Sequence, residues 1–72
     1  MAQKTGTLVF DEYTDRYDIR FDIDNYYGGL HCGECMDVYI DGKWTSTRIE
    51  YDENWYLVGI TTKDLNGLQV KI

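Results

Sequence analysis

The Asp41-Gly42 dipeptide constrains the fold of this chain more than any other feature. It joins two runs in which apolar residues alternate with polar ones, at 36–40 and 43–51. Asp-Gly in that setting predicts a β-hairpin, because both central residues of a type I′ turn need positive φ. A two-residue loop also sets the register, so Tyr39 is expected opposite Trp44.

A second turn, at 52–54, predicts that the chain returns along the same hairpin over 55–61. Asn54 tolerates the left-handed conformation that a three-residue loop requires, and this loop places Ile49 opposite Leu57. Successive side chains of a strand point to opposite faces, so the hairpins have an apolar face and an outer face. The apolar face, expected to form the core, holds Met36, Val38, Ile40, Thr45, Thr47, Ile49, Tyr51, Trp55 and Leu57. The outer face, expected to meet solvent, holds Asp37, Tyr39, Trp44, Ser46, Arg48, Glu50, Tyr56 and Val58.

Strand signals continue on both sides of these hairpins. Residues 6–10 are β-prone, and residues 16–22 alternate strictly between apolar and charged side chains. The segment 22–33 has no regular pattern and is expected to be a long loop. Residues 64–67 predict a short helical turn closed by Asn-Gly, and residues 68–72 a final strand.

These signals predict an all-β fold, a small SH3-like barrel of five to six short antiparallel strands with a short helical turn before the last strand. A chain of 72 residues is expected to form one domain, 1–72. A domain this small buries only about 60% of the surface that its unfolded chain exposes, so it needs large side chains in its core. We expect several of the seven tyrosines, two tryptophans and two phenylalanines to supply them.

Thirteen acidic and seven basic residues give the chain a net charge of −6. Nucleic acids and anionic membranes bind clustered positive charge, whereas these basic residues are scattered, so neither is expected as a partner. No apolar stretch approaches the roughly 20 residues that span a bilayer, and the first residues do not resemble a signal peptide. We therefore expect a cytoplasmic protein in which Cys32 and Cys35 are reduced.

The segment His31-Cys32-Gly33-Glu34-Cys35 is the most conspicuous local cluster of reactive side chains. Two thiolates at this spacing can bind zinc, but a structural site needs four ligands and the chain has no further Cys or His. The cluster is therefore interpreted as a turn that leads into a strand, with a metal-binding module at Cys32 and Cys35 kept as an alternative. No cofactor and no enzymatic activity are expected.

The outer face is the stronger functional candidate. Tyr39, Trp44, Arg48, Glu50 and Tyr56 combine aromatic surface with charge, as the centres of protein interfaces do. These five residues predict a site that binds another protein or a peptide, and thus a non-enzymatic protein-interaction module. In the structural alternative, the aromatic rings cover the open side of a bent barrel and the two charged residues form a structural pair.

Two further hypotheses remain open. The acidity of the chain favours a regulatory protein that imitates nucleic acid and occupies a basic partner. The Tyr26-Tyr27-Gly28-Gly29 loop suits recognition, and it suits equally a lid folded over the end of the barrel.

The sequence also resembles a known family. Trp44, Thr47-Arg48-Ile49-Glu50-Tyr51 and Trp55-Tyr56-Leu57-Val58-Gly59 are similar to segments of a small uncharacterised domain family of Gram-positive bacteria. Leu30-His31-Cys32-Gly33 and the alternating run 17–21 fit the same family. The resemblance implies a free-standing bacterial domain without an established function, and it carries over no catalytic residues.

Overall fold

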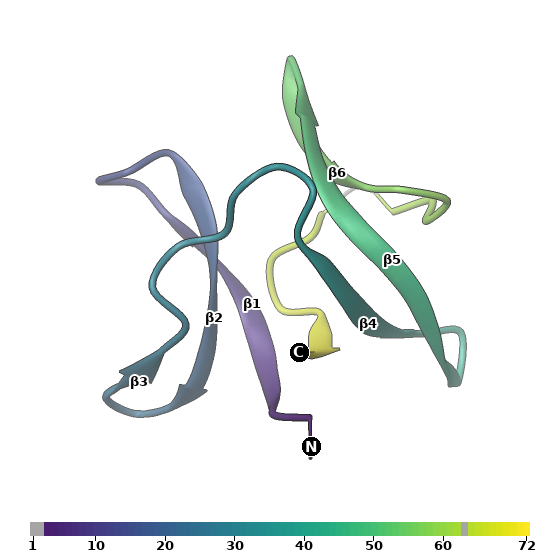
Figure 1. Ribbon diagram of the computed structural model, residues 1–72, viewed down its shortest axis with the longest axis horizontal. Coiled ribbons are helices and arrows are strands. Elements are labelled where there is room, and N and C mark those ends of the chain that lie inside the picture. The colour runs from purple at the N-terminus through teal and green to yellow at the C-terminus, as the bar shows by residue number, and fades with distance from the viewer. Residues whose placement is uncertain (1–2, 63) are drawn as a thin grey trace.

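The computed structural model describes residues 3–62 and 64–72, and these residues form seven strands and no helix (Figure 1). The strands are β1 (Thr5–Asp11), β2 (Arg16–Asp22), β3 (Asn25–Tyr26), β4 (Cys35–Ile40), β5 (Lys43–Asp52), β6 (Asn54–Leu57) and β7 (Gln69–Lys71). All are antiparallel to their neighbours in one open sheet, in the order β3-β2-β1-β7-β4-β5-β6. The all-β prediction is confirmed, whereas the SH3-like barrel stays a prediction.

The short strand β7 joins the two halves of the sheet. In Figure 1, β1 to β3 lie on one side of the fold and β4 to β6 on the other, with the C-terminal strand between them. On one side, Val70 of β7 pairs with Gly6, and on the other with Val38. Lys4 and Ile72 extend the first of these pairings, since each donates its backbone N–H to the carbonyl of the other at 2.9 Å.

The two hairpins have the register that the turns predict. Asp41 and Gly42 have φ values of 52° and 81°, as a type I′ turn requires, and Tyr39 lies opposite Trp44. Beyond the second turn Ile49 lies opposite Leu57. The left-handed residue of that turn is Glu53, with a φ of 65°, rather than the expected Asn54.

The core is aliphatic, which corrects the expectation that aromatic side chains fill it. Its buried side chains are Leu8, Ile19, Leu30, Met36, Val38, Ile49, Leu57, Leu65 and Val70. Tyr51, placed on the core face by its alternation, is 54% exposed, and Trp55 is only half-buried. Both lie near the end of the β5–β6 hairpin, which rises above the rest of the fold at the top of Figure 1. The alternation correctly predicts their face, but the core does not extend that far along the hairpin.

Two segments near the C-terminus differ from the prediction for the same reason, a left-handed glycine. Gly59 (φ 77°) follows β6, which ends at Leu57 rather than at residue 61. At 64–67 the expected helical turn is replaced by a β-turn, in which the N–H of Leu68 donates to the carbonyl of Leu65 at 3.2 Å. Gly67 (φ 93°) cannot continue a right-handed helix there, and its N–H donates to Leu8 of β1 at 2.7 Å instead.

The central role of β7 leads to a stability prediction. Val70→Ala removes two methyl groups from a fully buried site between the halves, so we expect it to lower the free energy of unfolding by about 2–3 kcal/mol. The matched control Gln69→Ala alters an exposed side chain of the same strand and should change stability by less than about 0.5 kcal/mol. Urea denaturation followed by tryptophan fluorescence measures both. If the two substitutions lowered the free energy of unfolding equally, β7 would not hold the core together.

Candidate functional site

The five residues predicted as a binding site lie on the outer face of β4, β5 and β6. They form two clusters rather than one. Tyr39 and Trp44 pair across the first hairpin, with ring centroids 5.1 Å apart in an edge-to-face arrangement. Arg48, Glu50 and Tyr56 form the second cluster, in which Tyr56 lies directly opposite Glu50.

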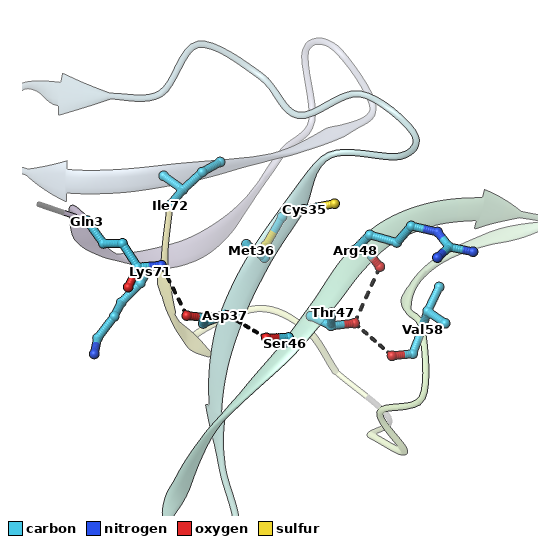
Figure 2. Close-up of a pocket in the computed structure, with 10 residues that line it drawn as sticks. All are labelled: Gln3, Cys35, Met36, Asp37, Ser46, Thr47, Arg48, Val58, Lys71 and Ile72. Carbon is cyan, nitrogen blue, oxygen red and sulfur yellow. Dashed lines mark hydrogen bonds between the residues drawn. The ribbon is translucent and has the colours of Figure 1, made fainter. Parts of the chain in front are cut away.

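A shallow hollow of about 430 Å³ separates these clusters, and Figure 2 shows the side chains that line it. Asp37 is the acidic group at its centre. Its carboxylate accepts hydrogen bonds from Nε2 of Gln3 at 3.0 Å and from Oγ of Ser46 at 3.1 Å. Nζ of Lys71, which also lines the hollow, lies 4.1 Å from the centroid of the Trp44 ring. Asp37 and Lys71 therefore each have a contact within the chain, Asp37 with neutral hydrogen-bond donors and Lys71 with an aromatic ring.

The charged pair of the second cluster is also satisfied internally. Nε of Arg48 donates to Oε2 of Glu50 at 2.9 Å, and this bond together with the charge of Glu50 raises the pKa of Arg48. The Arg48 side chain is 52% exposed, so the pair contributes little to stability. The geometry is compatible with the structural interpretation of this face, and binding by the five residues stays a prediction.

The cysteine cluster forms a surface turn. Cys32 and Cys35 are exposed free thiols, and the side chain of Glu34 is engaged in hydrogen bonds instead of pointing at them. Within residues 3–62 and 64–72, no three Cys, His, Asp or Glu side chains converge as metal ligands would. The geometry thus adds no support to the metal-binding alternative.

The Tyr26–Gly29 loop is held against its surroundings. Tyr27 donates its hydroxyl to Oε1 of Glu34 at 2.6 Å, and its backbone N–H donates to Ile19 of β2 at 2.9 Å. Gly28 donates its N–H to Oδ1 of Asp18 at 3.0 Å. These contacts favour the structural interpretation of this loop, which packs beside the turn at His31–Cys35.

An aromatic groove that the sequence did not predict lies on the other side of β6. It has a volume of about 790 Å³ and runs between β6 and the turn that joins β1 to β2. We call it the aromatic groove, after the side chains of Phe10, Tyr17, Tyr51, Trp55 and Tyr56 that line it. Of the five predicted binding residues, Tyr56 alone belongs to it.

Trp55 closes the floor of this groove. Its indole Nε1 donates to the backbone carbonyl of Asp15 at 2.8 Å, across 40 residues of sequence. Its ring makes an edge-to-face contact with Tyr51 at 5.0 Å, and the guanidinium carbon of Arg16 lies 6.0 Å from it. The far wall carries a second edge-to-face pair, Phe10 and Tyr17, at 5.1 Å.

The groove is acidic at its margins. Asp15 and Glu53 line it, and Asp64 is close enough to influence one of its tyrosines. Burial first, and then the negative charge of Asp64, raise the pKa of Tyr17. Among the residues that the structure describes, no Lys or Arg lines the aromatic groove, although the guanidinium of Arg16 lies near its Trp55 ring.

The open antiparallel sheet, the aliphatic core and the aromatic groove define a small all-β domain. The chain belongs to the family described as "Domain of unknown function (DUF5348)", whose model matches residues 6–72. This confirms the resemblance seen in the sequence at the level of a domain family of unknown function. In the described part of the chain no helix is long and apolar enough to cross a membrane.

A solved structure from Ruminococcus gnavus, a Gram-positive bacterium, is similar over nearly the whole length. It is a crystal structure from a structural genomics consortium, is 53% identical, and superimposes with a TM-score of 0.90. The match covers 94% of this chain and 99% of the other. No curated protein matches the chain.

The contact between Tyr27 and Glu34 leads to a pH-dependence prediction. The carboxylate accepts a hydrogen bond from the phenol and repels the phenolate, so the pKa of Tyr27 in the folded chain is raised above its ordinary value. The stabilisation is complete below the unfolded pKa of about 10, and it is lost as the pH rises through the higher folded value. We therefore expect Tyr27→Phe to melt at a temperature that falls less steeply above about pH 10 than that of the wild type.

Calorimetry between neutral and alkaline pH measures this difference. Tyr13→Phe is the matched control, because Tyr13 is fully exposed. If the melting temperatures of both variants fall with pH as steeply as that of the wild type, the contact between Tyr27 and Glu34 does not form in solution.

Proposed function

We propose that this domain is a non-enzymatic protein-interaction module. The observation that carries the proposal is the distribution of its aromatic side chains. None of them is fully buried, and Phe10 and six tyrosines are each at least 40% exposed. The buried core is aliphatic and only three aromatic side chains, Tyr17, Phe21 and Trp55, pack partly against it, so most of the aromatic surface exceeds what the core requires. Exposed aromatic side chains gathered on one part of a surface are typical of binding sites.

Two surfaces are candidates for this role. The outer face, with Tyr39, Trp44, Arg48, Glu50 and Tyr56, is the one that the sequence predicts. The aromatic groove is the candidate that the geometry adds, because it is concave and gathers five aromatic side chains in one place, with polar groups between them. On the outer face, Asp37 and Arg48 already make hydrogen bonds within the chain.

A regulatory protein that imitates nucleic acid is the second candidate function. The observation that favours it is the net charge of −6. The two functions differ in their salt dependence. Binding that rests on exposed charges weakens steeply as ionic strength rises, whereas binding through aromatic surface does not.

Selection from a random peptide library on the immobilised domain tests the proposal. We expect peptides of a common pattern to be enriched. If these peptides occupy the outer face, Trp44→Ala should lower their affinity several-fold. If they occupy the groove, Tyr51→Ala should do so instead. Tyr13→Ala is the control, because Tyr13 is exposed on the β1–β2 turn and lines neither hollow. Circular dichroism establishes that each variant is folded.

Two results would contradict the proposal: no enrichment over a blank surface, or enriched peptides whose affinity none of the surface variants changes. If the bound peptides are released at moderate salt, and the immobilised domain also captures basic proteins that bind nucleic acid, the second candidate function is favoured instead.

A further inference from the structure

The free edge of β6 opens into the aromatic groove. All four residues of β6, Asn54–Leu57, line the groove, and β6 is the last strand of the sheet. An edge strand presents backbone N–H and C=O groups that have no partner strand. The groove therefore offers backbone hydrogen bonds as well as aromatic side chains.

The pairing of β5 with β6 shows which backbone groups face the groove. Val58 donates its N–H to the carbonyl of Arg48 at 3.1 Å, so this position of the ladder is one where the backbone groups face each other. In an antiparallel ladder such positions alternate with pairs that are not hydrogen-bonded. It follows that Tyr56 points its backbone groups at β5, while Trp55 and Leu57 point theirs away from it.

Only one of these outward groups has a backbone partner among the described residues. The carbonyl of Leu57 accepts from the N–H of Ile60 at 3.1 Å, which agrees with the outward direction. The alternation directs the N–H and C=O of Trp55 and the N–H of Leu57 away from β5, and outside the strand ladders no backbone hydrogen bond to these groups is found among residues 3–62 and 64–72. Together these three groups match the pattern that one added strand would satisfy.

We propose, resting on the function proposed above, that an extended and basic segment of a partner protein adds to β6 as an eighth strand within the aromatic groove. One residue of the segment exchanges two hydrogen bonds with Trp55, and a neighbouring carbonyl accepts from Leu57. Addition of a strand to a sheet edge is a common mode of peptide recognition, in which the backbone gives affinity and side-chain pockets give specificity.

The charge of the groove selects the occupant. Asp15, Glu53 and Asp64 lie in or beside it, and the whole chain carries a net charge of −6. Lys or Arg side chains of the segment meet these carboxylates together with the faces of aromatic rings, which attract cations. The chain itself uses that attraction three times, with Lys4 over the ring of Phe21, Arg16 near the ring of Trp55 and Lys71 over the ring of Trp44.

The probe is a synthetic nonapeptide in which lysine and threonine alternate, tested against the same peptide with glutamate in place of lysine. We expect the lysine peptide to bind and the glutamate peptide to bind at least about tenfold more weakly. In ¹⁵N-labelled domain, the backbone amides of Trp55 and Leu57 should become protected from hydrogen exchange when the lysine peptide is added. N-methylation at successive peptide positions should weaken binding at every second position, because alternate amides face the partner strand.

Two tyrosines of the same hairpin give a matched pair of variants. Tyr51 packs edge-to-face against Trp55 in the groove and Tyr39 packs edge-to-face against Trp44 on the outer face, at nearly equal distances. Tyr51→Ala should lower the affinity for the lysine peptide several-fold and Tyr39→Ala should not. Glu53→Gln should weaken binding, whereas Asp24→Asn, the same change of charge at the exposed β2–β3 turn, should leave it unchanged.

The outcomes separate this inference from the proposed function. If the lysine peptide fails to bind, or the amides of Trp55 and Leu57 stay unprotected, the inference is wrong, while peptides enriched from the library still support an interaction module. If the library yields no binder, the proposed function is wrong as well. A dimer in light scattering, with protected Trp55 amides in the absence of peptide, would also overturn the inference, because a second copy would then occupy the edge.

Discussion

The pairing of β7 with both β1 and β4 is the interaction on which the rest of the structure depends. Without this three-residue strand the chain would consist of two three-stranded units, each with one apolar face and no partner. Val70, at its centre, is fully buried in the same core as Leu8 and Val38. Small sheets become stable when such faces cover one another, so the last residues of the chain complete the core that the first residues begin.

The division between an aliphatic core and aromatic borders follows from this arrangement. The core lies where the two halves meet around β7, and its space is filled by Leu, Ile, Val and Met. Aromatic side chains fall mostly at strand ends and turns, beyond the region that the halves cover. Trp55 illustrates the result: it packs partly against the core and also reaches across to Asp15 of the other half. Its ring thereby becomes both a structural contact and the floor of a groove.

What could be predicted from the sequence was set by local chemistry. Asp41-Gly42 needs only its own dihedral angles to specify a turn, and the turn carries the register of Tyr39 and Trp44 with it. The contact between Trp55 and Asp15 depends instead on how two hairpins pack, and no local pattern contains that information. The outer face was therefore predicted and the groove was not. A signal did exist, since eleven aromatic side chains are too many for a core of nine buried residues.

The groove differs from the outer face in what keeps it open. On the outer face, Asp37, Arg48 and Trp44 each have a partner within the chain, so a ligand there would have to replace contacts that already exist. In the groove, the hydrogen bond from Trp55 to Asp15 fixes β6 relative to the β1–β2 turn, and the edge of β6 keeps backbone groups directed outward. A ligand strand would satisfy backbone groups that β6 directs away from β5. The same bond that ties the two halves together thus also prepares the place where a third chain segment fits.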